Sequence, residues 1–161
     1  MKQFIIIKIM TITQEIKQFQ RTEDGHLILM SNEERNLLIT DLTARIKYGV
    51  ICLIERVDDF GSIHRNEKLT GFCFDDIGGF HFEVGGGLEI VFAEKIIPYL
   101  RPLSSMTEEE KETHEMFFNE DVLLNTSVDT YVDWLLSCHF DFRGLIPMGL
   151  ALEAPKDMYV L

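Results

Sequence analysis

The sequence predicts an α+β fold built as a single domain over residues 1–161, with a mostly antiparallel sheet of about four strands and three helices. The length of 161 residues is typical of one domain. Hydrophobic residues make up 46% of the chain and charged residues 26%, which is an ordinary globular composition. Two helix-opening motifs, one amphipathic stripe and three short alternating runs separated by glycine turns supply the elements.

Three segments are predicted as helices. Ser31 and Glu34 form a capping-box pattern, and apolar residues follow at helical spacing, so we expect a helix over 32–46. Thr107 and Glu110 repeat the pattern and predict a helix over 107–118. A third helix, over 127–139, has the clearest apolar stripe. The residues of that stripe are Val128, Tyr131, Val132, Leu135, Leu136 and His139.

Four short runs are predicted as strands. Residues 50–54 are apolar at every position, which is typical of a strand covered on both faces, whereas 58–67 are polar and predict a loop. Three alternating runs then predict an antiparallel meander with one aromatic-rich face against helix 32–46. These runs are 69–75, 80–84 and 88–92. Two prolines frame 98–102, which predicts a sheet edge or a connector.

The predicted core combines apolar positions from these helices and strands. Trp134 lies beside the third helical stripe, so we expect it to be buried at least in part. The other expected core residues are Leu38, Leu42, Ile51, Leu53, Phe72, Phe82, Ile90, Tyr131 and Leu135.

The N-terminus predicts neither a secretory signal nor a membrane anchor. The apolar run of the first ten residues is broken by Lys8, and no small-residue cleavage pattern follows. No segment approaches the ~20 apolar residues that span a bilayer. Met10 is a second possible start, so residues 1–9 are predicted to be an optional extension. We therefore expect a cytoplasmic protein that has no contact with a membrane.

Net charge limits the class of partner. Lys and Arg total 15 against 27 Asp and Glu, a net charge of -12, which argues against nucleic-acid binding. Residues 104–161 contain 12 acidic and 3 basic residues and carry most of this charge. Such a surface can bind a basic protein partner, although acidic runs are also typical of solvated helices that need no partner. The candidate binding residues here are Glu108, Glu109, Glu110 and Glu112.

Two residues are weak candidates for catalysis. His81 and Glu83 lie two apart on a predicted strand and so share a face, where a carboxylate can support a histidine as general base. The same pair is also typical of the solvated face of a half-buried sheet. If this pair is catalytic, the protein is a small-molecule-binding or hydrolytic enzyme that uses the meander.

No metal or cofactor is predicted. Cys138 and His139 are adjacent on a predicted helix, so their side chains diverge by about 100° and do not easily face one ion. The glycine clusters at 78–79 and 85–87 fit hairpin turns and match no phosphate-binding loop. Three cysteines without a Cys-x-x-Cys spacing make a disulfide framework improbable.

Three segments can be compared with other proteins: Asp41–Val50 (DLTARIKYGV), Pro98–Glu110 (PYLRPLSSMTEEE) and His139–Pro155 (HFDFRGLIPMGLALEAP). The second and third have distinctive sequences. They resemble small uncharacterised proteins that recur in genomes of gut Bacteroidetes and in their phages and mobile elements. No activity is established for this group, so the resemblance implies no catalytic residues. It implies a cytoplasmic protein associated with a bacterial mobile element or phage.

The recurring segments contain polar residues within apolar stretches, and two roles are open for them. Arg143 can pair with Asp141 or with an acidic helix and so clasp the segments together. Alternatively, Tyr99, Arg101 and Arg143 can line a binding surface, since Arg and Tyr are favoured interface residues.

The sequence thus favours a non-enzymatic accessory or protein-interaction protein that uses its acidic C-terminal half. The enzyme that would use His81 and Glu83 is the alternative.

Overall fold

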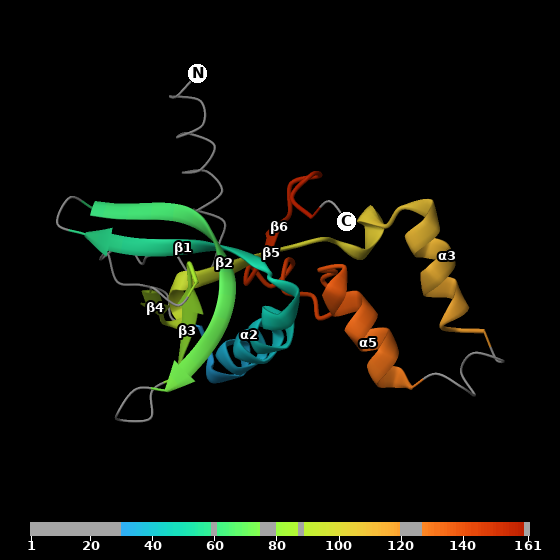
Figure 1. Ribbon diagram of the computed structural model, residues 1–161, viewed down its shortest axis with the longest axis horizontal. Helices are drawn as coiled ribbons and strands as arrows, with labels where there is room; N and C mark the ends of the chain where they lie inside the picture. Colours follow the sequence, from blue (N-terminus) through green and yellow to red (C-terminus); the bar gives the residue numbers. More distant parts are fainter. Residues whose placement is uncertain (1–29, 59–60, 75–79, 87–88, 120–126, 160–161) are drawn as a thin grey trace, which may run out of the picture.

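The computed structural model describes residues 30–58, 61–74, 80–86, 89–119 and 127–159. Within these residues it has three α-helices and a six-stranded mixed sheet in the order β4-β3-β2-β1-β5-β6 (Figure 1). The α+β class is therefore confirmed, but the sheet has six strands rather than about four, and β6 runs parallel to β5. Residues 1–9, the predicted extension, lie outside the described residues.

Local capping signals place all three helices close to their predicted positions. α2 spans Asn32–Arg45, α3 spans Glu108–Met116 and α5 spans Val128–Ser137. Both predicted capping boxes are present, with the side chains of Ser31 and Thr107 accepting from the backbone N–H groups of Glu34 and Glu110. Ser127 caps α5. After α2, a single 3-10 turn ends at Gly49, whose φ of 67° suits a residue without a Cβ.

The sheet depends on one long, bent strand. β2 pairs along its first part with β1 and along its second part with β3, with a register shift between Leu69 and Gly71. Figure 1 shows β2 as a curved arrow that leaves β1 and reaches β3. The strands are β1 (Ile51–Asp58), β2 (Gly61–Phe74), β3 (Phe80–Val84), β4 (Glu89–Val91), β5 (Ile96–Leu100) and β6 (Leu152–Glu153).

Two strand predictions are wrong. Most of the loop predicted at 58–67 belongs to β2. Backbone hydrogen bonds pair β2 with β1 from Asp58↔Gly61 onward, and such pairing extends a hairpin even where the sequence has no apolar pattern. The predicted edge or connector at 98–102 is largely β5, which lies inside the sheet between β1 and β6. Its outer neighbour β6 comes from residues 152–153, so no local signal could have predicted that pairing.

The core is confirmed around α2 and the centre of the sheet, where Leu38, Leu42 and Phe82 are fully buried. Leu53 and Leu135 are buried as predicted, whereas Ile51, Tyr131 and Trp134 are half-buried.

Phe72 and Ile90 were predicted in the core and are 45% and 60% exposed. Ile90 pairs with Glu83, while Val91 pairs with Phe82, so the core face of β4 carries Val91. Phe72 pairs with Phe82 but lies two residues from the end of β2, where Phe74 is also exposed.

α3 packs against α5 through aromatic rings rather than through a buried apolar stripe. None of the residues of α3 is buried. The Phe117 ring, directly after α3, lies 5.7 Å from that of Trp134, and the Tyr131 hydroxyl is 2.9 Å from His114 Nε2. Across the described ranges, no helix combines the length and the apolar character needed to cross a membrane.

Candidate functional site

Three segments that are distant in sequence, Asp41–Val50, Pro98–Glu110 and His139–Pro155, meet in one place. The Arg101 N–H donates to the His139 carbonyl (2.9 Å), and the Asp141 N–H donates to the Arg101 carbonyl (2.7 Å). From the first segment, Arg45 Nη2 donates to the Phe140 carbonyl at 2.8 Å. These bonds join α2, the end of β5 and the chain after α5 into one framework.

Arg101 and Glu110, both candidate binding residues, bind each other. The guanidinium Nη1 and Nη2 each lie 2.7 Å from a different carboxylate oxygen, a bidentate pair. The guanidinium also lies 4.4 Å from the centroid of the Phe140 ring. The hydrogen bonds from Arg101 hold the pKa of Glu110 below its usual value, with a further contribution from the Thr107 N–H.

Arg143 pairs with a carboxylate, but with neither of the partners that the sequence suggested, Asp141 or the acidic helix α3. Its Nη1 lies 2.5 Å from Asp41 Oδ1 in α2, and Asp41 also receives two hydrogen bonds from Arg45. Asp141 instead accepts from the backbone N–H groups of Leu145 and Ile146, at 2.7 and 2.8 Å. Asp41 and Arg45 are fully buried, so Arg143 anchors the third segment to the core.

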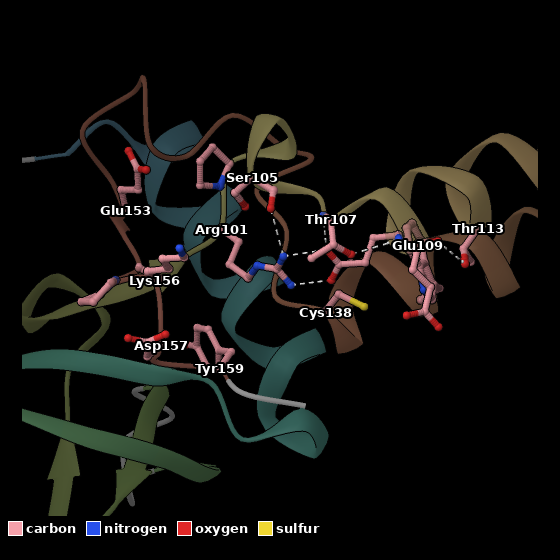
Figure 2. Close-up of a pocket in the computed structure, with 15 residues that line it drawn as sticks. Arg101, Ser105, Thr107, Glu109, Thr113, Cys138, Glu153, Lys156, Asp157 and Tyr159 are labelled. Atoms are coloured by element: carbon pink, nitrogen blue, oxygen red, sulfur yellow. Dashed lines mark hydrogen bonds and ion pairs between the residues drawn. The ribbon is translucent and has the colours of Figure 1, made fainter.

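A cleft of about 880 Å³ opens beside this framework, between α3 and the C-terminal tail, residues 153–159. We call it the α3–tail cleft. Figure 2 shows side chains of α3 on one side, those of the tail on the other, and Arg101 between them. Its lining is Arg101, Pro102, Ser105, Thr107, Glu109, Glu110, Thr113, Trp134, Cys138, Glu153, Ala154, Pro155, Lys156, Asp157 and Tyr159.

The far end of the tail is fastened to the sheet by the Tyr159 hydroxyl group. The Ile51 N–H donates to the Tyr159 hydroxyl, which in turn donates to the Tyr99 carbonyl, both at 2.9 Å. The Tyr159 ring stacks on His139 with centroids 3.8 Å apart. Burial, reinforced by the charges of Arg45 and Arg101, lowers the pKa of His139 to about 4, so this ring is neutral near pH 7.

The remaining candidate residues are divided between the cleft and other surfaces. Glu109 lines the cleft together with Arg101 and Glu110. Tyr99 packs beside Leu53 and Ile97 and does not reach it, and burial raises the pKa of its hydroxyl.

The other two candidate glutamates of α3 face elsewhere. Glu108 and Glu112 are exposed outside the cleft lining, and Glu108 pairs with Lys111 at 2.6 Å.

His81 and Glu83 lie in β3, which Figure 1 shows on the opposite side of the molecule from α3, and neither residue lines the α3–tail cleft. His81 is 7% exposed, and its ring centroid is 4.5 Å from that of Phe92. Glu83 lies across Gly71, where an added Cβ would come within 2.5 Å of the carboxylate. Little of the imidazole surface is therefore open to a substrate.

Sequence reasoning missed the residues that the tail contributes to the cleft: Glu153, Lys156, Asp157 and Tyr159. The only available signal was the set of apolar residues between positions 150 and 160, which favours docking of the tail on the body.

Among the residues that the structure describes, no group of three or more His, Cys, Asp or Glu side chains is arranged to hold a metal ion. No known protein family matches the chain, and no curated protein or solved structure shows significant similarity to it.

Proposed function

We propose that this protein is a non-enzymatic, cytoplasmic accessory protein that binds another protein through its acidic C-terminal half. The resemblance of its recurring segments supports a setting in a bacterial mobile element or phage. The observation that carries the proposal is the surface of α3. None of its residues is buried, and its glutamates other than Glu110 are exposed.

The acidic residues of α3 exceed what the fold itself uses. Glu110 closes the capping box and pairs with Arg101, and Glu108 pairs with Lys111. In the described part of the chain, Glu109, Glu112 and Glu115 have no ion-pair partner. A negative helix on a chain with net charge -12 attracts positively charged surfaces and repels nucleic acid.

Affinity capture with the tagged full-length chain tests this proposal, using a lysate of the organism that encodes it. The test variant removes four charges from α3 and keeps Glu110, because that residue is structural. The test variant changes Glu108, Glu109, Glu112 and Glu115 to Gln. The control removes the same number of charges from the N-terminal half. The control changes Glu33, Glu55, Glu67 and Glu94 to Gln.

We expect the wild type and the control to capture one partner in stoichiometric amount and the test variant to lose it. Retention of that partner by the test variant would place the interface elsewhere. If the wild type captured no partner at any salt concentration, the proposal would fail, and ligand screening around His81 and Glu83 would follow.

A further inference from the structure

We propose that the α3–tail cleft holds a basic, extended segment of the partner protein, whose Lys or Arg side chains lie against Glu109 at one end and Glu153 and Asp157 at the other. This inference rests on the proposed function and assigns it to one place. It also states the chemistry of the bound segment.

The cleft is large enough for such a segment and is built from separate parts of the chain. Its volume of about 880 Å³ lies within the range of about 300–1,000 Å³ that is usual for ligand sites. Its lining comes from the β5–α3 connection, α3, the end of α5 and the tail. Figure 2 places Glu109 on the α3 side and Glu153 and Asp157 on the tail side. Because carboxylates lie at both ends, the cleft suits a chain that carries several cations better than it suits one compact cation.

The charges of the lining favour a cationic occupant. Arg101 and Glu110 neutralise each other through their bidentate pair. The carboxylates of Glu109, Glu153 and Asp157 have no ion-pair partner among the described residues, and Lys156 is the one further cation of the lining. An acidic segment would have to break the Arg101–Glu110 pair to find a guanidinium, whereas a basic segment finds carboxylates already available.

Apolar side chains between the charges suit the stems of Lys and Arg. Trp134, Pro102 and Pro155 line the cleft together with the Tyr159 ring. Long basic side chains bury their methylene stems along such surfaces while the charged ends remain solvated or paired. Trp and Tyr rings also attract cations through their faces.

Both sides of the cleft are held before any partner binds. The Tyr159 hydroxyl fixes the tail to β1 and β5, and the Arg101–Glu110 pair fixes the start of α3. A site already held in place loses less conformational entropy on binding, which increases affinity.

Trp134 is the only tryptophan in the chain, so its fluorescence reports on the cleft directly. The probe is a lysine–alanine peptide, titrated into the full-length protein and compared with a glutamate–alanine peptide of equal length. The cleft variant carries Glu109→Gln, Glu153→Gln and Asp157→Asn. The matched control loses the same charge from exposed positions of α3 outside the cleft. It carries Glu108→Gln, Glu112→Gln and Glu115→Gln.

We expect the lysine peptide to bind the wild type and the glutamate peptide not to bind. The cleft variant should lose about tenfold or more in affinity, and the control should stay within about twofold of the wild type. Equal losses in both variants would mean that only the overall field attracts the peptide, which overturns the inference. Spermine that displaced the peptide at matched charge concentration would identify a polyamine site and overturn the peptide assignment.

Partner capture with the same two variants separates this inference from the proposed function. A partner lost by the cleft variant and kept by the control supports both. A partner kept by the cleft variant and lost by the control leaves the proposed function standing and overturns the inference. Failure of the wild type to capture any partner removes the proposed function, and the peptide titration then tests the cleft by itself.

Discussion

Asp41 is the carboxylate on which the buried ion pairs depend. It is fully buried and receives hydrogen bonds from Arg45 and Arg143, which approach from within α2 and from the segment after α5. The Phe142 ring lies against both guanidinium groups. Its centroid is 4.5 Å from Arg143 Cζ and 5.8 Å from Arg45 Cζ. Two cations share one carboxylate, so removal of either changes the charge balance of the interior.

Replacing these arginines with alanine should have unequal effects on stability. Arg45→Ala leaves a fully buried carboxylate without its bidentate partner and should cost about 3–5 kcal/mol. Arg143→Ala should cost about 1–2 kcal/mol, because Asp41 keeps Arg45 and the Arg143 side chain is 21% exposed. Urea unfolding measures both free energies. An Arg143→Ala variant as stable as the wild type that no longer captures a partner would assign Arg143 to a binding surface.

The Arg101–Glu110 pair should make stability depend on pH below the usual glutamate range. Because the folded pKa of Glu110 is lowered, its contribution is present above the unfolded pKa of about 4.3 and is lost as the pH falls through the folded pKa. Glu110→Gln removes the charge and retains a side chain that can complete the capping box. The wild type should exceed this variant by about 1–2 kcal/mol at pH 7.

Unfolding free energies measured along an acid titration test the sign of this effect. The difference between the wild type and Glu110→Gln should shrink below about pH 4.3 and close at lower pH. Glu109→Gln is the matched control, since Glu109 has no ion-pair partner in the described part of the chain, and should show no such dependence. A difference that stays constant with pH would show that the ion pair does not stabilise the fold.

At the scale of elements, signals that act within one turn predicted the helices well. The capping boxes at Ser31 and Thr107 and the cap at Ser127 fix helix starts through contacts three residues apart, which a sequence displays directly. Strand pairing depends on distant partners instead. The alternation in β4 was assigned one residue out of phase, and a shift of one residue exchanges the faces, so Ile90 was placed in the core instead of Val91.

The candidate site was predictable only in part for the same reason. Arg101, Glu109 and Glu110 were singled out, and all three line the α3–tail cleft. Their mutual arrangement was not predictable, because the Arg101–Glu110 pair depends on how α3 turns back after β5. The tail side of the cleft depends on the parallel pairing of β6 with β5, between residues about 50 positions apart.

The apolar stripe of α5 is the element that should be most sensitive to truncation. Leu135 is 2% exposed and packs in a cluster with Cys138 and Phe140. Leu135→Ala should therefore cost about 2–5 kcal/mol in unfolding free energy. Val128 belongs to the same predicted stripe but is 75% exposed, so Val128→Ala is the matched control and should change stability little. Similar losses at both positions would mean that the helix is oriented differently.

At the scale of the whole molecule, the buried ion pairs and the surface charges have different roles. Three arginines are held by the fold itself: Arg45 is buried, and Arg101 and Arg143 are each paired with a carboxylate. Each pair neutralises a guanidinium group that would otherwise add positive charge to the surface. The exposed glutamates of α3 keep their charge, and residues 104–161 contain 12 of the 27 acidic residues of the chain but only 3 of the 15 basic ones. The C-terminal part of the chain therefore carries most of the net negative charge.

This asymmetry predicts how fast a basic segment reaches the α3–tail cleft. Long-range attraction speeds association, and dissolved ions screen it over about 8 Å at physiological ionic strength. Stopped-flow measurements of Trp134 fluorescence should show the association rate constant of a lysine–alanine peptide falling steeply with added salt. The dissociation rate constant should change less, because contacts within the cleft are short and partly shielded from solvent. The variant with Glu108, Glu112 and Glu115 changed to Gln should associate more slowly, by no more than about twofold, while dissociating at the wild-type rate. If salt changed only the dissociation rate, the acidic half would contribute contact energy without steering the encounter.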